Sequence, residues 1–332
     1  GYADDVIGYN FVDNEPNPNT EVADHGSHTA GTVAAKNGNG TFGAGVAGGD
    51  GSPDSGVRLM ITPFLADPPT GGGTIADAVE AITYATNNGA VISNNSWGAG
   101  GSTPPALQQA IDDFVNNAGG PDAPLDGGIF VNSAGNSDAP ASGFSPAEYG
   151  PVFTVSSTED TDTKSSFSNF GEAIDVAAPG GEFGEDGVWS AVNGGFDSIS
   201  GTSMAAPHVA GAAALVASVD PSQTLDAGTV EQILTDTGKD ISDNQPERMG
   251  PRIDAAAAVA SVSGDDTPPA PVEDLAAVKD SSDTPGAAVK LTWTAPGDDG
   301  EEGTADSYDI RYSLDGAIDD STSFANAHSL EL

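Results

Sequence analysis

Between residues 57 and 156, the sequence alternates between short apolar runs and longer segments in which apolar residues recur every three or four positions. The first pattern is typical of buried strands, and the second of amphipathic helices. Strands are predicted at 57–62, 90–94, 128–133 and 152–156, and helices at 74–88 and 104–117. Strands that alternate with helices of this length favour a parallel sheet covered by helices on both faces, which is an α/β fold.

A second region follows a change in composition. Residues 261–271 (SVSGDDTPPAP) are rich in Pro, Gly and Asp, which is typical of a linker. Beyond them, 288–294 and 307–313 alternate with a period of two, which indicates antiparallel strands. We therefore predict a domain over residues 1–262, a linker over 263–270 and a smaller all-β domain over 271–332.

The chain carries 50 acidic and 9 basic residues, a formal net charge of −41 that is spread along its whole length. Nucleic acid is excluded as a partner, because phosphate binding draws on clustered Lys and Arg. Such a surface fits a salt-adapted secreted protein, in which salt screens the self-repulsion, and it fits an ordinary acidic secreted protein equally well. Both interpretations stay open.

Cysteine is absent, which excludes a disulfide framework, a thiolate metal site and a cysteine nucleophile. Gly1 opens directly into polar sequence, so no signal peptide is predicted there, and no membrane span is predicted from the apolar runs. Acidic stretches at 13–21 and 182–186 allow structural calcium. No ligand spacing is diagnostic, so we assign no metal residue.

Three residues stand in segments that can carry chemistry. His25 opens a stretch of small residues, where an imidazole can act as a general base near neutral pH. Ser203 stands near the start of a predicted helix, whose free N–H groups favour negative charge on a bound oxygen. Asn136 follows a predicted strand, where its amide can donate to such an oxygen. Taken singly, a polar loop histidine, an N-cap serine and a turn asparagine are the commoner interpretations.

Taken together, these segments resemble the subtilase family of subtilisin-like serine peptidases. The matching motifs are DHGSHTAGT at 24–32, with Ser27 where Thr is more usual, VNSAGN at 131–136 and SGTSMAAPHVAG at 200–211. Supporting matches are NSWG at 95–98, SFSNFG at 166–171 and DVAAPG at 175–180. The resemblance covers roughly residues 4–260 and implies a subtilisin-like three-layer fold with a mostly parallel central sheet.

The resemblance also implies a role for each candidate residue. His25 is the general base, Ser203 the nucleophile, and Asn136 forms the oxyanion hole together with the backbone N–H of Ser203. The implied substrate-binding residues are Ser96, Trp97 and Gly98, whose backbone binds the substrate as an added strand, and Ala134 and Gly135, which form part of the S1 wall.

The implied protein is a serine endopeptidase that hydrolyses peptide bonds of proteins through an acyl-enzyme. It needs no cofactor for its chemistry, binds protein or peptide substrates, is a monomer, and is extracellular or on the cell surface. His28 and His208 stand in the motifs but have no chemical role in the family, so we predict that they are structural. Lys164 is predicted to be a surface residue.

The acid of the family's triad has no match in this sequence. In the family it stands upstream of the histidine, in an Asp-Thr-Gly or Asp-Ser-Gly motif. None of the acidic residues before His25 is followed by such a pair, namely Asp4, Asp5, Asp13, Glu15, Glu21 and Asp24. We therefore expect the triad Asp and its strand to lie upstream of residue 1, and the 332-residue chain to be inactive and poorly folded.

The C-terminal region resembles part of a bacterial fibronectin type III domain. The matching stretches are PVEDL at 271–275, LTW at 291–293 and YDIRY at 308–312. An incomplete β-sandwich is therefore predicted, because the region is shorter than the roughly 100 residues of such a domain.

Two other functions share part of these sequence features. One is a binding or adhesion protein with a catalytically dead, peptidase-like scaffold, which the sequence upstream of residue 1 would decide. The other is a sedolisin-like acid peptidase, a family that shares the Gly-Thr-Ser segment. That family uses a carboxyl base and an Asp at the oxyanion position, where this chain has His25 and Asn136, so we reject it.

Overall fold

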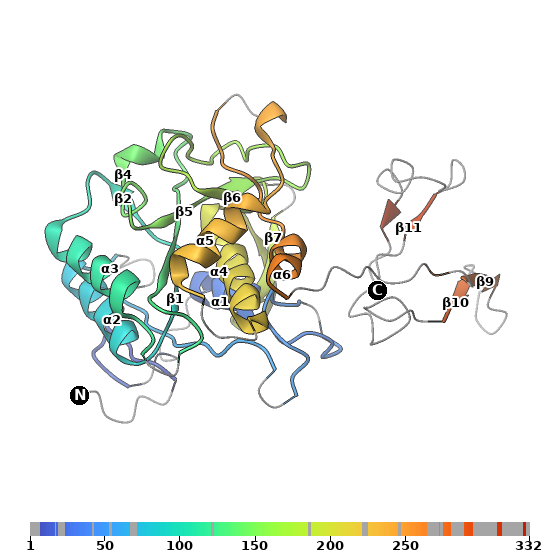
Figure 1. The fold of residues 1–332 in the computed structure, drawn as a ribbon, viewed down its shortest axis with the longest axis horizontal. Coiled ribbons are helices and arrows are strands. Elements are labelled where there is room, and N and C mark those ends of the chain that lie inside the picture. The colour runs from blue at the N-terminus through green and yellow to red at the C-terminus, as the bar shows by residue number, and fades with distance from the viewer. Residues whose placement is uncertain are drawn as a thin grey trace. The chain divides into compact units, whose positions relative to one another are not determined.

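In the computed structural model the chain divides into two compact units, residues 1–263 and 264–332 (Figure 1). In the first unit the structure describes residues 7–16, 18, 24–41, 43–52, 55–66, 72–120, 123–184, 187–220, 225–244 and 247–263. In the second it describes 272, 275–279, 289–294, 311–313 and 328–329.

A four-stranded parallel sheet forms the centre of the first unit (Figure 1). Its order is β1-β3-β5-β6, and its strands are β1 (Ile92–Asn95), β3 (Ile129–Ser133), β5 (Phe153–Thr158) and β6 (Val176–Pro179). The strands predicted at 90–94, 128–133 and 152–156 are thus confirmed. Because all four strands run in the same direction, their carboxyl ends meet at one edge of the sheet, and both Ser96 and Ala134 emerge there.

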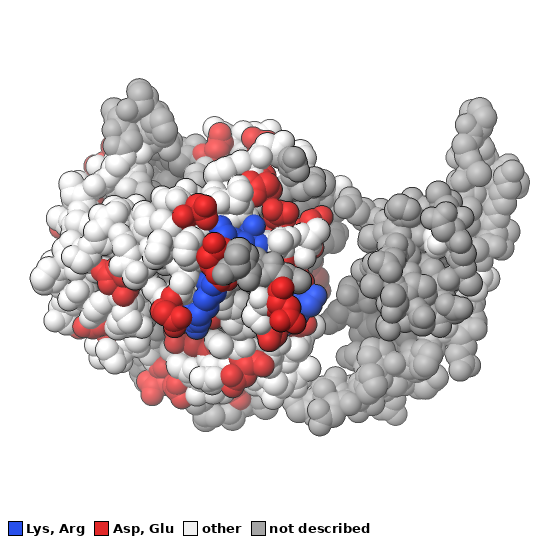
Figure 2. Space-filling model, turned by 90° about the horizontal axis from the view of Figure 1, so that it is seen from above, with Lys and Arg blue, Asp and Glu red and all other residues white. Residues whose placement is uncertain are grey.

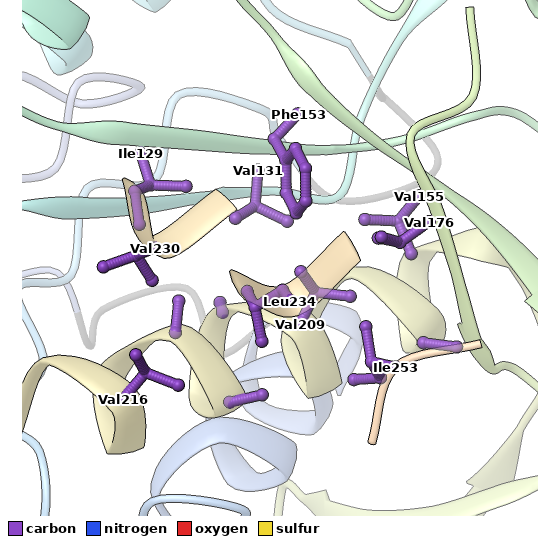
Figure 3. Close-up of a cluster of buried hydrophobic side chains, with 14 of the residues drawn as sticks. Ile129, Val131, Phe153, Val155, Val176, Val209, Val216, Val230, Leu234 and Ile253 are labelled. Atoms are coloured by element: carbon purple, nitrogen blue, oxygen red, sulfur yellow. The ribbon is translucent and has the colours of Figure 1, made fainter. Parts of the chain in front are cut away.

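Helices cover both faces of this sheet. One face packs against α2 (Ile75–Asn87) and α3 (Pro105–Asn117), and the other against α4 (Thr202–Val219), α5 (Ala227–Asp236) and α6 (Ala255–Ser263). Side chains alternate along β3, since Ile129 and Val131 join the α4 side while Phe130 joins the α3 side. Figure 3 shows the buried side chains on the α4 side of the sheet, with Val209 and Val216 of α4 below the strands. This is the predicted three-layer α/β fold.

Local sequence signals set the ends of the two helices on the α3 side. Thr74 caps α2, because its hydroxyl accepts from the backbone N of Asp77 while the Asp77 carboxylate accepts from the backbone N of Thr74. Gly89 follows α2 with a φ of 86°, which favours glycine. Pro105 occupies the first position of α3, where no backbone donor is needed. Both predicted helices are confirmed.

Further elements complete the first unit. α1 (Asp24–Ala34) packs against α4 and against a hairpin formed by β7 (Val188–Val192) and β8 (Gly195–Ile199). β2 (Ala99–Gly100) pairs antiparallel with β4 (Phe144–Ser145). The 3-10 turns at Ala141–Gly143 and Ser242–Asn244 complete the described elements of this unit.

The strand predicted at 57–62 is wrong. Within this segment only Ile61 forms a β-bridge, a parallel one with Gly8, through bonds from Tyr9 N to Ile61 O and from Ile61 N to Ile7 O. A strand with a continuous apolar run is expected to be paired and covered on both sides. Here Leu59 is 40% exposed, so the apolar run marks an extended segment without a regular ladder.

The prediction of no membrane span overlooked the length of one apolar run. α4 has 18 residues and is apolar enough to cross a bilayer by length and composition alone. Its valines and alanines, however, pack against the sheet on one side and against α1 and α6 on others. The apolar character of α4 therefore reflects its place in the core of the first unit.

The second unit contains two antiparallel strand pairs among its described residues. β9 (Ala276–Lys279) pairs with β10 (Val289–Thr292), and β11 (Arg311–Tyr312) pairs with β12 (His328–Ser329). These pairs agree with the antiparallel pattern expected at 288–294 and 307–313. The fibronectin type III prediction depends largely on residues that lie outside the described ones, so it stays a prediction.

Basic side chains of the first unit lie beside carboxylates, as Figure 2 shows on one face. Asp162 binds both Lys239, at 2.7 Å, and Arg252, at 2.5 Å. Burial by itself would raise the pKa of Asp162, but the two cations lower it more, so the pKa lies below its usual value. Lys239 and Arg252 are therefore engaged with the same acidic neighbour.

Candidate active site

Ser203 is the second residue of α4 and faces a pocket at the carboxyl edge of the sheet. The first backbone N–H groups of a helix have no acceptor within it, so the N–H of Ser203 is a free donor of α4. The Ser203 hydroxyl donates a long bond of 3.4 Å to the carbonyl of Ser96, which follows β1. A hydroxyl held so weakly is available to a ligand in the pocket.

Pro207 explains why Ser96 is tied to the same residue. In a regular helix the carbonyl of Ser203 would accept from the N–H of residue 207, but a proline has none. The Ser96 hydroxyl supplies the missing donor, at 2.8 Å from the Ser203 carbonyl oxygen. One bond thus connects the end of β1 to the first turn of α4 across 107 residues of sequence.

Asn136 lies three residues after β3, and its side-chain orientation is set by Thr202. The Asn136 Oδ1 accepts from the backbone N of Thr202 at 2.9 Å and from its hydroxyl at 2.8 Å. Because both partners are donors, the oxygen must face Thr202, which leaves Nδ2 as a donor toward the pocket. A β-carbon on Gly201 would lie 3.4 Å from this Nδ2 and 3.7 Å from the Ser203 N. The two donors therefore flank the same small space.

The pocket has a volume of about 300 Å³ and is open to solvent. Its walls combine the segment after β1, the loop after β3, the β4 region and the start of α4. The lining residues are Trp97, Gly98, Ala99, Gly100, Ser133, Ala134, Gly135, Asn136, Ser137, Phe144, Ser145, Ala147, Thr202 and Ser203. None of them is charged, so the pocket suits an uncharged side chain.

His25 is the second residue of α1, the helix that packs against α4. Although the residue is exposed overall, withdrawal of its ring from water lowers the pKa of His25 below 6.5, and the neighbouring His28 lowers it further. Within the described part of the chain, no hydrogen bond joins His25 to Ser203 or to a carboxylate. His25 also does not line the pocket.

His28 and His208 behave as structural residues. The His28 ring is completely buried, and its Nε2 bonds to the carbonyl of Val188 at 2.8 Å, which ties α1 to β7. Burial lowers the pKa of His28, although this bond and the Asp197 carboxylate oppose the effect. The His208 ring bonds through Nδ1 to the carbonyl of Met204 within α4, and burial lowers its pKa as well.

No metal site can be assigned. Among the residues that the structure describes, no group of three or more acidic or histidine side chains is placed to hold a metal ion. In the acidic stretch 182–186, the Glu182 carboxylate already accepts from the N and hydroxyl of Ser166 and from the N of Phe183. Calcium remains a prediction without residues.

The structure thus brings seven of the eight predicted site residues together around one pocket, and His25 stands on the helix that packs against α4. Trp97, Gly98, Ala134 and Gly135 line the same pocket as Asn136 and Ser203, and Ser96 is bonded to Ser203. Sequence reasoning missed Thr202, whose hydroxyl both donates to Asn136 and accepts from the backbone N of Gly135 at 3.1 Å. Its position beside Ser203 in the GTS motif was the available signal.

The fold and this site define a subtilisin-like α/β protein. The chain belongs to the subtilase family, peptidase family S8, whose model matches residues 2–250.

Comparison with individual proteins agrees with this family. The chain is 37% identical over 214 residues to the thermophilic serine proteinase of Bacillus sp. (strain AK1), a match covering 64% of this chain and 47% of that protein. It is 35% identical over 255 residues to the halolysin-like extracellular serine protease Nep of Natrialba magadii, covering 76% and 42%. The chain therefore spans less than half the length of these two curated relatives.

A solved structure of a protease from Pseudoalteromonas arctica is similar with a TM-score of 0.66 and 29% sequence identity. The match covers 79% of this chain and 88% of that one.

Proposed function

We propose that this protein is a serine endopeptidase. The observation that carries the proposal is the convergence of three groups in one pocket. The Ser203 hydroxyl opens into the pocket, and the Ser203 N–H and the Nδ2 of Asn136 flank one space beside it. A hydroxyl beside two fixed N–H donors is the arrangement that stabilises a tetrahedral oxyanion during attack on a carbonyl.

The mechanism assigns one role to each group. Ser203 Oγ attacks the peptide carbonyl carbon while His25 takes the hydroxyl proton, and the oxyanion receives hydrogen bonds from the Ser203 N and from Asn136 Nδ2. His25 then gives the proton to the leaving amine as the C–N bond breaks. Water hydrolyses the resulting ester of Ser203, with His25 again as base. This scheme needs no cofactor.

The substrate is proposed to bind as an extended strand along Ser96, Trp97 and Gly98. Gly98 and the short strand β2 are exposed, so backbone groups at this edge can pair with a peptide. Ala134 and Gly135 form the adjoining wall, which would place an uncharged substrate side chain in the pocket.

The direct test is casein hydrolysis by the longest product that the gene encodes, compared with its Ser203→Ala variant. We expect hydrolysis by the parent and none above background by the variant. Ser218→Ala provides the matched control, because Ser218 is an exposed serine at the other end of the same helix. Equal hydrolysis by the parent and by Ser203→Ala would exclude the proposal.

We further propose that the carboxylate partner of His25 lies upstream of residue 1. The sequence motif for it is missing before His25, and His25 has no carboxylate partner in the described structure. β1, moreover, is only half-buried over Ile92–Asn94, whereas β3 is buried throughout. A half-covered strand agrees with a missing neighbour in the sheet.

On this proposal the 332-residue chain is inactive and poorly folded, while a longer product is active. In subtilisin, removal of the triad Asp lowers kcat by about 3 × 10⁴. Casein hydrolysis by the 332-residue chain that Ser203→Ala abolishes would contradict this part alone. If no longer product hydrolyses casein, the scaffold alternative is favoured, for which the supporting observation is that no described carboxylate binds His25.

The location and the second unit complete the proposal. An extracellular location agrees with the relative from Natrialba magadii, which is named as an extracellular protease; the cell-surface alternative, the monomeric state and structural calcium stay predictions. The second unit is proposed to be part of a fibronectin type III-like sandwich, which its antiparallel pairs β9–β10 and β11–β12 support.

A further inference from the structure

We propose that Asn169 is a positioning residue that holds the loop carrying Asn136, and that it acts on catalysis through Asn136. This inference depends on the proposed peptidase function. Asn169 does not line the pocket and lies 33 positions away from Asn136 in the sequence.

The Asn169 side chain bonds to three backbone groups of this loop. Its Oδ1 accepts from the N of Ser137 at 3.0 Å and from the N of Ala139 at 3.2 Å, and its Nδ2 donates to the carbonyl of Ala134 at 2.8 Å. These partners lie on either side of Asn136. Asn169 is completely buried, so its bonds are not exchanged with water.

Backbone bonds add to this contact. The N of Asn169 donates to the carbonyl of Gly135 at 2.9 Å, and the N of Asp138 donates to the carbonyl of Phe167 at 2.8 Å. Residues 134–139 are therefore held against residues 167–169 along most of their length. Asn136 is an exposed residue of this loop, and its own described bonds go only to Thr202.

Gly135 shows how closely the Asn169 amide approaches the loop. A β-carbon on Gly135 would lie only 2.4 Å from the Asn169 Nδ2. Gly135 also has a φ of 103°, which side chains rarely permit. A side chain at position 135 would therefore collide with the Asn169 amide, so the close contact between the two segments requires glycine next to Asn136.

Lys164 supports the same loop through Asp138. The prediction that Lys164 is a surface residue is wrong, because its side chain is only 10% exposed. Its ammonium binds the Asp138 carboxylate at 2.6 Å and the Ser168 carbonyl at 3.2 Å, and it lies 5.5 Å from the centre of the Phe170 ring. Lys164 therefore links the loop to the segment that carries Asn169.

The physical consequence concerns the position of Asn136 Nδ2. Replacing Asn169 with an apolar residue of similar size removes the acceptor of the part-buried N–H groups of Ser137 and Ala139, at a cost of about 1 kcal/mol each. The loop can relieve this cost by moving toward water, and Asn136 would move with it. Because an oxyanion donor works only at hydrogen-bond distance, a small shift weakens the transition state more than substrate binding.

The test is a double-mutant cycle on the active form of the protein, with Asn169→Leu, Asn136→Leu and the pair. We expect Asn169→Leu to lower kcat by at least about 10-fold and by no more than removal of an oxyanion donor does. KM should change less than about 3-fold. In the Asn136→Leu background, Asn169→Leu should lower kcat less than about 3-fold, because the residue through which it acts is gone.

Asn10→Leu provides the matched control. Asn10 is also buried, and its Oδ1 also accepts from two backbone N–H groups, those of Val12 and Asp13 at 2.8 and 3.1 Å, in a different loop. It should lose stability as Asn169→Leu does and keep its kcat. An equal fall in kcat for both single variants, or an equal fall for Asn169→Leu in both backgrounds, would overturn the inference.

If Asn169→Leu does not fold, Lys164→Met is used in the same cycle, because it keeps the stem and removes only the ammonium. A several-fold loss of kcat that disappears in the Asn136→Leu background is expected, and unchanged kcat overturns the inference. The proposed function fails separately, if Ser203→Ala retains full activity.

Discussion

The two halves of the site are held in different ways. The half that contains Ser203 and Asn136 is supported from several directions by bonds within the described chain, through Thr202, Ser96 and Asn169. The half that contains His25 is held through its neighbours, because, among the described residues, Asp24 accepts from Asn193 N at 2.9 Å and His28 is anchored to β7.

This difference shows that an oxyanion hole and a general base have separate structural requirements. The first needs donors fixed relative to a helix start, which local packing can supply. The second needs an imidazole that is oriented by a further group, and the described residues do not supply one to His25. The following predictions test whether the two halves nevertheless work as one unit.

The largest effect is expected at His25. In the active form of the protein, His25→Ala should lower kcat by about 10⁶, the magnitude known from subtilisin, because the nucleophile loses its base. Combining it with Ser203→Ala should cause no further loss, since the two act together. Single-turnover and steady-state hydrolysis of a chromogenic peptide measure this. His328→Ala, in the second unit, is the control. A loss of kcat below 10-fold for His25→Ala would show that the half with Ser203 and Asn136 works without His25.

Asn136→Leu should have the next largest effect. Loss of one oxyanion donor is expected to lower kcat by about 10²–10³ with little change in KM, a magnitude borrowed from subtilisin. Asn39→Leu is a close control, because the Oδ1 of this exposed residue likewise accepts from the N and hydroxyl of one threonine, Thr41. If KM rose while kcat stayed constant, Asn136 would bind the substrate rather than the transition state.

Glu231 lies outside both halves of the site, and its replacement should change stability without changing activity. Burial, with the nearby carboxylates of Asp175 and Asp226, raises the pKa of Glu231 from 4.5 to about 7. The folded state therefore holds this proton more tightly than the unfolded chain, and the stability it contributes below pH 4.5 is lost as the pH rises to about 7.

Glu231→Gln should accordingly raise the free energy of unfolding at pH 8 by roughly 2–3 kcal/mol and change it little at pH 4. Urea unfolding at the two pH values measures this, with Glu80→Gln on the exposed side of α2 as the control. Activity per folded molecule should not change, because Glu231 lies outside the pocket. The same gain at both pH values would contradict the assigned cause.

The smallest effect is expected at Ser96. Ser96→Ala leaves the Ser203 carbonyl without a donor, because Pro207 cannot supply one, and should lower the free energy of unfolding by about 1–2 kcal/mol. Ser218→Ala on the same helix removes a similar serine-to-carbonyl bond, to Leu215 at 2.7 Å, and should cost less because that bond is exposed. Thermal unfolding compares the two, and equal losses would show that Pro207 is irrelevant to Ser96.

Periodicity in the sequence was sufficient for the central elements. The apolar spacing in 74–88 and 104–117 predicted α2 and α3, and the apolar runs predicted β1, β3 and β5. The same logic failed at 57–62, where a run typical of a buried strand formed only one bridge. An apolar run records burial, but a ladder depends on neighbours that the run does not specify.

By itself the sequence determined the order of the layers and the motifs that contain Ser203, Asn136 and His25, because these follow from local spacing and residue type. The tertiary structure alone decided that Thr202 orients Asn136, that Lys164 is buried beside Asp138, and that Asn169 holds the loop. The physical reason is that the partner of a buried polar group is chosen by packing between segments far apart in the chain, and residue spacing carries no information about that choice.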